Sequence, residues 1–413
     1  MRCFLLVFLF LLAVAKLGAE PAWPEWRGPL GTGVTPAKGP TSLDPKKDLR
    51  WKVTLPGRGT STPAVAEGRV FLTAPIDGKD AALCYSLENG ELLWQAVFDR
   101  VREPRHRLGS SANPSPVTDG EFVYCYFKSG TLMALDLEGQ VQWEVNIQKT
   151  YGKDTLGFDL GTSPVLIDEV LLIAVIQRGD PFLLGLDPKT GRRLWKTDRD
   201  YQVASESAAT YSTPAVAESP AGKLILSFGA DRLSAHEARS GKFLWDVAGF
   251  NPENRGNWRT IASPVVAGNT AIVTYGRGDF LAGVRFDEKG GEMVWNRRSD
   301  GNDVPTPATT GNLVWVLSGR GNLECLEADS GERLWDHTFP KTRGKYWSSP
   351  VLAGSTIYCV RDDGTVFTGT VTARDGLEKV QSFSLGEEII ASPVVVEGIC
   401  LIRTQESLFC FEG

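Results

Sequence analysis

The sequence is poor in the residues and patterns that metal centres and most catalytic sites require. It contains only three histidines, His106, His236 and His337, which lie far apart in the chain. It has no C-x-x-C pair, no H-E-x-x-H, no G-x-S-x-G elbow, no phosphate-binding G-x-x-x-x-G-K-S/T loop and no complete calcium loop. Because zinc enzymes, α/β-hydrolases and nucleotide-binding enzymes depend on such patterns, these classes are disfavoured.

Long apolar runs and an excess of positive charge are also lacking. The one long apolar run, residues 4–15, follows the single positive charge of Arg2 and is too short to cross a bilayer. It predicts a signal peptide, residues 1–19, cleaved after Ala15 or Ala19, and therefore an exported, periplasmic or extracellular protein without a transmembrane span. A net charge of −6 disfavours nucleic acid as a partner.

The cysteines show no obvious disulfide pattern. Six remain after removal of the signal peptide, and they are Cys84, Cys125, Cys325, Cys359, Cys400 and Cys410. Export would permit a disulfide, and Cys400 and Cys410 are predicted to lie on neighbouring strands of one hairpin. Packed thiols are the favoured interpretation, because sister repeats hold Ala, Gly or Val in these slots. The sequence does not decide whether Cys400 and Cys410 form a disulfide.

What the sequence does contain is a repeat. A short phrase of small hydroxyl or apolar residues, proline and an apolar run occurs eight times, with its proline at Pro63, Pro116, Pro164, Pro214, Pro264, Pro307, Pro350 and Pro393. A second phrase, Gly-x-x-x-Trp, follows at Trp94, Trp143, Trp195, Trp245, Trp295 and Trp335. The spacing is typical of propeller blades, and each unit has the apolar runs and turns of four short strands.

The two ends of the repeat predict how the ring closes. After Pro393 the chain supplies only three strands, whereas "LRWKVTL" around Trp51 precedes the first anchor. We expect this N-terminal strand to complete the last blade, which would leave no open sheet edge. The sequence therefore predicts an all-β, eight-bladed β-propeller over residues 49–413, after an extended Pro/Gly-rich segment at residues 20–48. The tryptophans are predicted to pack between blades.

The phrases "LGLDPKTGRRLW" and "ALDLEGQVQW" resemble the repeat of the pyrroloquinoline-quinone-like propeller family. The resemblance covers residues 49–413, and the segment "WPEWRGPLGTGV" is similar to the leader of exported bacterial members. The family includes the outer-membrane assembly-factor propeller, which implies a scaffold for partner proteins. It also includes quinoprotein alcohol dehydrogenases, which implies an alternative in which the channel holds the quinone and calcium.

The dehydrogenase alternative lacks support in this sequence. The resemblance implies an adjacent cysteine pair and a large insertion over the cofactor, and neither is present. We therefore expect no cofactor and no catalytic residue, and lean towards a protein that is not an enzyme. A second enzymatic alternative, a hydrolase or lyase, would use His106 with a rim carboxylate such as Asp159. His236 is predicted to be packed, and His337 to face solvent.

Binding is predicted at the face that carries the long connections. The loops that leave the Trp strands and the turns that join the two middle strands emerge on one face, around the channel mouth. Arginines and aromatic residues outside the Gly-x-x-x-Trp phrase gather on this face. The residues expected to bind a ligand there are His106, Arg107, Asp159, Arg178, Trp258, Arg259, Arg277, Arg320, Tyr346 and Trp347. We expect the protein to be a monomer, and its expected partner is a protein segment or an anionic glycan. Salt bridges around the rim are the alternative role for the charged residues.

Overall fold

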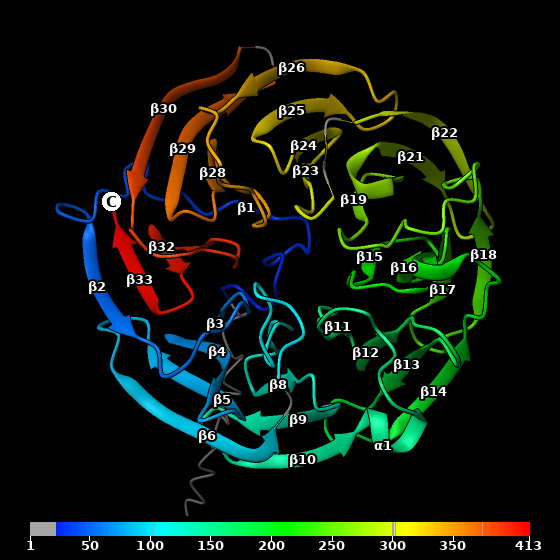
Figure 1. Cartoon of the computed structure of the whole chain (residues 1–413), viewed down its shortest axis with the longest axis horizontal. Helices are drawn as coiled ribbons and strands as arrows, with labels where there is room; N and C mark the ends of the chain where they lie inside the picture. The colour runs from blue at the N-terminus through cyan, green and yellow to red at the C-terminus, as the bar shows by residue number, and fades with distance from the viewer. Residues whose placement is uncertain (1–21, 102, 300, 302, 374) are drawn as a thin grey trace, which may run out of the picture.

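The eight repeats form eight four-stranded antiparallel blades around a central axis (Figure 1), as predicted. The computed structural model describes residues 22–101, 103–299, 301, 303–373 and 375–413. The predicted signal peptide, residues 1–19, lies outside these residues. No helix in the described part of the chain is long and apolar enough to cross a membrane.

The first four blades follow one another along the chain, each running from the innermost to the outermost strand. Blade 1 has β3 (Ala64–Ala66), β4 (Arg69–Ile76), β5 (Lys79–Ser86) and β6 (Leu92–Val101). Blade 2 has β7 (Val117–Thr118), β8 (Phe122–Tyr126), β9 (Thr131–Asp136) and β10 (Val141–Asn146). Blade 3 has β11 (Val165–Ile167), β12 (Val170–Val175), β13 (Phe182–Leu186) and β14 (Arg193–Asp198). Blade 4 has β15 (Ala215–Ala217), β16 (Leu224–Gly229), β17 (Arg232–Glu237) and β18 (Phe243–Val247).

The other four blades continue this order, and the last one closes the ring. Blade 5 has β19 (Val265–Ala267), β20 (Thr270–Tyr275), β21 (Phe280–Phe286) and β22 (Gly291–Arg298). Blade 6 has β23 (Ala308–Thr310), β24 (Leu313–Leu317), β25 (Asn322–Glu327) and β26 (Arg333–Thr338). Blade 7 has β27 (Val351–Ala353), β28 (Thr356–Val360), β29 (Thr365–Thr372) and β30 (Gly376–Ser384). Blade 8 has β31 (Val394–Val396), β32 (Ile399–Arg403), β33 (Ser407–Glu412) and, from the N-terminal side, β2 (Leu49–Thr54).

In the described residues, three short helices lie in the connections between blades or strands. They are α1 (Ile147–Tyr151), η1 (Ser205–Ala208) and η2 (Gly276–Gly278). The predicted closure is confirmed, because β2 pairs antiparallel with β33 and brings Trp51 opposite Cys410. The six cysteines are free and buried, so the packed-thiol interpretation holds and Cys400 and Cys410 form no disulfide here.

The tryptophans of the Gly-x-x-x-Trp phrase pack between blades, as predicted. Each ring packs against a glycine of the next blade. The Trp94 indole donates a 2.8 Å hydrogen bond to the carbonyl of Leu137 in blade 2. A Cβ at Gly139 would lie 2.6 Å from that ring, so a larger residue would push the two blades apart. Gly139 also has a φ of +83°, which favours glycine. The Gly-x-x-x-Trp phrase therefore links neighbouring blades: its glycine receives the tryptophan of the preceding blade.

The segment before β2 crosses the propeller axis on the face with the short turns. Trp23 pairs with Val65 in blade 1, and the Pro24 carbonyl accepts a hydrogen bond from the Thr118 amide in blade 2. Across the axis, Arg27 donates to carbonyls in blades 6 and 7, and β1 (Val34–Thr35) pairs in parallel with β27. In Figure 1 this segment runs through the centre of the ring. It covers the channel at this end.

His236 occupies a position on β17 that holds leucine in other repeats, and it is 1% exposed, as the sequence predicts. Burial lowers its pKa to about 4, from 6.5. A histidine that must stay neutral in the folded state contributes stability that is complete above pH 6.5 and is lost as the pH falls towards 4. His337, predicted to face solvent, is instead half-buried and packs edge-on against Phe339.

The low pKa of His236 gives a testable pH dependence. Between pH 6.5 and pH 4 we expect the free energy of unfolding to fall by about 3 kcal/mol more in the wild-type protein than in a His236→Leu variant. Urea denaturation followed by circular dichroism at several pH values measures the difference. Parallel pH profiles of the two proteins would contradict it.

Candidate functional site

A closed ring of hydrogen bonds surrounds the axis at the start of the inner strands. The residue before each anchor proline is a serine or threonine, and its backbone N–H donates to the hydroxyl oxygen of the corresponding residue in the next blade. The eight bonds measure 2.8–3.1 Å and join Thr62, Ser115, Ser163, Thr213, Ser263, Thr306, Ser349 and Ser392, the last of which returns to Thr62. We call these residues the hydroxyl ring.

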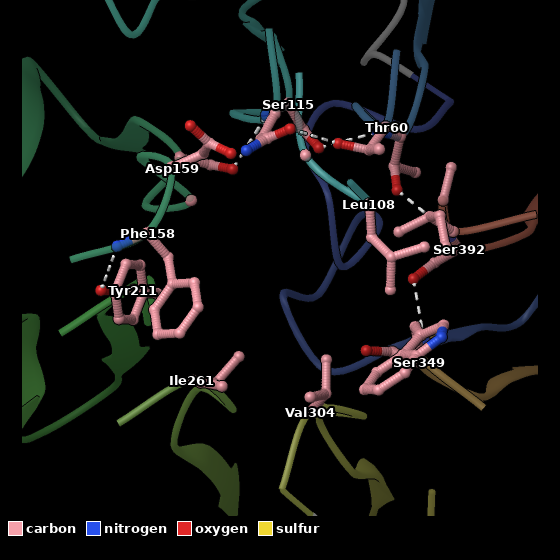
Figure 2. A pocket seen from close by; sticks show the side chains of 18 of the residues that line it. Thr60, Leu108, Ser115, Phe158, Asp159, Tyr211, Ile261, Val304, Ser349 and Ser392 are labelled. Atoms are coloured by element: carbon pink, nitrogen blue, oxygen red, sulfur yellow. Dashed lines mark hydrogen bonds between the residues drawn. The ribbon is translucent and has the colours of Figure 1, made fainter. Parts of the chain in front are cut away.

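Above the hydroxyl ring, a funnel with a volume of about 350 Å³ opens on the long-loop face. Figure 2 shows side chains from several blades arranged around its centre. The wall is mainly apolar, and its large apolar members are Trp26, Leu108, Phe158, Tyr211, Ile261, Val304, Trp347 and Ile390. Five hydroxyl-ring residues line its floor, and they are Thr62, Ser115, Ser163, Ser349 and Ser392. Trp26 comes from the crossing segment.

A buried ion pair fixes the loop that brings His106 to the funnel. Lys128 and Asp159 are 1% and 3% exposed in their side chains and form a close ion pair. The same carboxylate accepts hydrogen bonds from the backbone N–H groups of Arg105, at 2.7 Å, and His106, at 3.0 Å. His106 packs edge-on against Phe158, and its Nδ1 accepts a bond from the Leu108 amide at 3.2 Å. Asp159 is thus already neutralised and serves to position the loop.

Four arginines of the rim, Arg58, Arg107, Arg259 and Arg277, are paired with carboxylates. Arg259 lies 3.7 Å from Glu206 and 3.7 Å from Asp303, and its guanidinium lies over the Phe158 ring. Arg277 contacts the same Glu206 at 3.1 Å. On the other side of the mouth, Glu388 lies between Arg58 and Arg107, at 3.0 and 3.2 Å. Burial raises the pKa of the Asp303 carboxyl. These four arginines are therefore already neutralised by carboxylates of the rim.

Four of the ten residues predicted to bind a ligand line the funnel, and they are His106, Asp159, Arg259 and Trp347. The Trp347 indole donates to Asp362 at 2.9 Å, which holds it at the wall. The other charged residues lie outside the funnel: Arg107 and Arg277 in rim ion pairs, Arg178 on Ser205, and Arg320 on an exposed turn.

Trp258 and Tyr346, which were also predicted to bind a ligand, do not line the funnel. Trp258 is 8% exposed and packs on Gly276, while Tyr346 is 2% exposed and packs on Gly321. A Cβ at either glycine would lie less than 3 Å from the ring, at 2.8 and 2.6 Å respectively. The glycine at the turn between the two middle strands has no side chain, and the aromatic ring occupies the space that a side chain would fill. Each aromatic residue is therefore buried.

Sequence reasoning missed much of the funnel wall and its floor. Phe158 and Tyr211 form one side, where the Phe158 amide donates to the Tyr211 hydroxyl at 3.0 Å (Figure 2). Trp26 belongs to the segment "WPEWRGPLGTGV", for which no role in the site was predicted. The serine or threonine before each anchor proline was present in the repeated phrase, and its regularity was the signal for the ring.

The residues around the funnel do not fit a quinone with calcium. Among the described residues, no three His, Cys, Asp or Glu side chains gather in a way that could hold a metal ion. The one carboxylate among the lining residues, Asp159, is occupied by Lys128 and two backbone amides. A calcium ion needs several free oxygen ligands of this kind, so the donor set at the funnel does not suit it.

The curated relatives that match this chain are named as outer membrane protein assembly factors. The outer membrane protein assembly factor BamB of Burkholderia pseudomallei is 26% identical over 299 residues, which cover 69% of this chain and 70% of the relative. BamB of Xanthomonas campestris pv. campestris is 23% identical and covers 83% and 79% of the two chains.

The solved structures show the fold alone. The crystal structure of BamB from Moraxella catarrhalis superposes with a TM-score of 0.62 at 17% identity, over 88% of this chain and 97% of that one. A europium-containing methanol dehydrogenase superposes with a TM-score of 0.70 at 12% identity, over 95% and 98% of the two chains.

A family model matches most of the chain. The model described as outer membrane protein assembly factor BamB matches residues 41–179, 160–283 and 282–388, which together make up most of the chain. The chain therefore belongs to this family of pyrroloquinoline-quinone-like repeat propellers.

Proposed function

We propose that this protein is an exported, non-catalytic binding platform whose funnel receives an apolar side chain of a protein segment. The observation that carries the proposal is the mainly apolar wall of the funnel, which is lined by residues of the long loops and by Trp26 of the crossing segment. Pockets of this shape bury an anchoring side chain, and such anchors dominate the affinity of protein interfaces. The relatives named as outer membrane protein assembly factors support a role among proteins outside the cytoplasm.

The charges of the rim favour a protein segment over an anionic glycan. A glycan with sulfate or carboxylate groups would need free cations around the mouth. Arg259 and Arg277 share Glu206, and Arg107 shares Glu388 with Arg58. These pairs would have to be broken before the arginines could bind an anion, whereas an apolar side chain can enter the funnel without disturbing them.

Site-specific photo-crosslinking in intact cells tests this proposal. A photoreactive residue in place of Val304, on the funnel wall, is expected to form adducts with protein, which mass spectrometry identifies. The same residue in place of Asn312, which is exposed near the short turn of blade 6, is expected to form none. Equal yields at the two positions, or adducts at neither, would rule the funnel out as the docking site.

A pair of variants makes the crosslinking experiment specific. Phe158→Asp places a charge in the apolar wall and should reduce the Val304 adduct about tenfold or more, because a side chain entering the funnel would lose its apolar contact. Leu194→Asp makes the same chemical change at a residue that is 43% exposed on the outer strand β14, and should leave the yield unchanged. A stoichiometric chromophore in the visible spectrum of the purified protein would contradict the non-catalytic part of the proposal.

A further inference from the structure

The hydroxyl ring has hydrogen-bonding capacity that the fold does not use. Each ring oxygen accepts a backbone N–H, and a hydroxyl that accepts still has one proton to donate. Within the described residues, none of the eight hydroxyls donates a hydrogen bond to another protein group. The five that line the funnel floor are 2–5% exposed. The floor therefore presents several buried donors that share one small space.

Two buried arginines stand next to the ring without a carboxylate. Arg27 is 5% exposed and donates from Nη2 to the carbonyls of Pro307 and Pro350, the residues directly after Thr306 and Ser349 of the ring. Its Nε and Nη1 have no hydrogen-bond partner among the described residues. Trp26, the preceding residue, lines the funnel.

Arg403 repeats this arrangement on the side of blades 8 and 1. It is fully buried and donates from Nη1 to the carbonyl of Ser61, the residue before Thr62 of the ring. Its Nε and Nη2 are also without a partner in the described part of the chain. Burial lowers the pKa of both arginines to about 9, which leaves them charged at neutral pH. Neither guanidinium lies within 4 Å of a described carboxylate. Their contribution to the floor is their charge, because they are too buried to touch a ligand.

The one carboxylate among the lining residues is already paired, and burial raises the pKa of the Glu25 carboxyl in the crossing segment to about 7, so that it balances the arginines only in part at neutral pH. Asp159 is committed to Lys128 and to two amides, as described above. Water could accept the hydroxyl protons, but water would leave the remaining positive charge unbalanced. We propose that the floor of the funnel binds the carboxylate of an organic acid, with hydroxyls of the ring as hydrogen-bond donors. The wall of Phe158, Trp347 and Ile261 above it suits an apolar or aromatic body on that acid.

This inference deepens the proposed function and rests on the same funnel, because an acidic group next to the anchoring side chain would fit a protein segment. The two proposals can fail separately. Binding of a free acid needs no protein partner, whereas the crosslinking experiment reports only on the partner. A protein that binds the acid but forms no adduct would keep the carboxylate site and lose the docking proposal, and the reverse result would do the opposite.

Isothermal titration with benzoate and benzamide tests the carboxylate site. The two molecules have nearly the same shape and differ in charge. In chloride-free buffer, benzoate is expected to bind one to one, at least about tenfold more tightly than benzamide, because hydrogen bonds to a charged acceptor are the stronger ones. Equal affinities would reduce the funnel to an apolar pocket and overturn the proposal, as would the absence of benzoate binding at millimolar concentration. Acetate should compete more strongly than chloride, and equal competition would overturn the assignment to a carboxylate.

Two double variants connect binding with the ring. Ser163→Ala with Ser392→Ala removes two donors at the floor, and should weaken benzoate binding about tenfold. Ser163→Thr with Ser392→Thr keeps both hydroxyls at positions where the ring elsewhere uses threonine, and should bind within about twofold of wild type. Circular dichroism shows whether the alanine variant is folded. Should it fail to fold, the comparison of benzoate with benzamide on the wild-type protein still decides the question. Equal affinities of the folded alanine and threonine variants would disprove the role of the hydroxyls.

Discussion

Replacing Trp51 by alanine is expected to lower the free energy of unfolding by about 3–5 kcal/mol, the range for truncating a large buried aromatic residue. Trp51 is 8% exposed and lies on β2, the one strand that the N-terminal side contributes to blade 8. Its indole donates to the Leu87 carbonyl in blade 1 at 3.1 Å, and a Cβ at Gly90 would lie 2.8 Å from its ring. The ring therefore joins the first and last blades as well as the two ends of the chain.

An internal tryptophan provides the matched control for this prediction. Trp143 occupies the same slot in blade 2, with its indole on the Pro188 carbonyl at 2.7 Å and its ring on Gly191. Trp143→Ala loses equivalent contacts, but its strand stays covalently continuous with its blade. We expect only Trp51→Ala to make the β2 region sensitive to limited proteolysis, because a released β2 would expose the edge of β33. Urea denaturation measures both variants. A loss below about 1 kcal/mol for Trp51→Ala would show that the closure does not depend on this side chain.

The sequence predicts the ring well because the ring depends on spacing. The anchor prolines, the Gly-x-x-x-Trp phrase and the missing fourth strand at the C-terminal end are all local patterns, and each blade repeats the same packing. β2 could therefore be assigned to blade 8 without knowledge of any loop. The long-loop face also follows from the order of the strands within a blade, and the funnel does lie on that face.

The site was less predictable because it depends on loops and on pairing between distant residues. Arg259 and Arg277 belong to different connections, and only the fold shows that both reach Glu206. Tyr346 precedes a strand anchor just as Trp347 does, yet one fills the hole above Gly321 and the other lines the funnel. No period distinguishes these two neighbours. Arg27 lies in the segment before the repeats and has no equivalent position in any blade. The sequence therefore contains no indication that its charge lies next to the hydroxyl ring.

Replacing Asp159 by alanine is expected to cost about 3–5 kcal/mol of stability, because it removes the buried carboxylate that pairs with the Lys128 ammonium. The side chain of Lys128 is 1% exposed, so solvent cannot replace the carboxylate. The backbone amides of Arg105 and His106 lose their acceptor at the same time. Urea denaturation at pH 7 measures the effect, and the double variant Lys128→Met with Asp159→Leu should recover part of the loss, since it removes both charges.

An exposed ion pair provides the control that shows whether burial causes the large loss of stability in Asp159→Ala. Lys223 and Asp168 approach to 2.6 Å, but their side chains are 32% and 65% exposed, and Asp168→Ala should cost less than about 1 kcal/mol. The Asp159 variant should also weaken binding in the funnel, because the amides that it frees hold His106 and, through its Nδ1, Leu108 at the wall. In the double variant stability is expected to return further than benzoate affinity, since two apolar side chains restore packing but offer the loop no acceptor. Recovery of both to the same extent would mean that the ion pair supports the fold without positioning the loop.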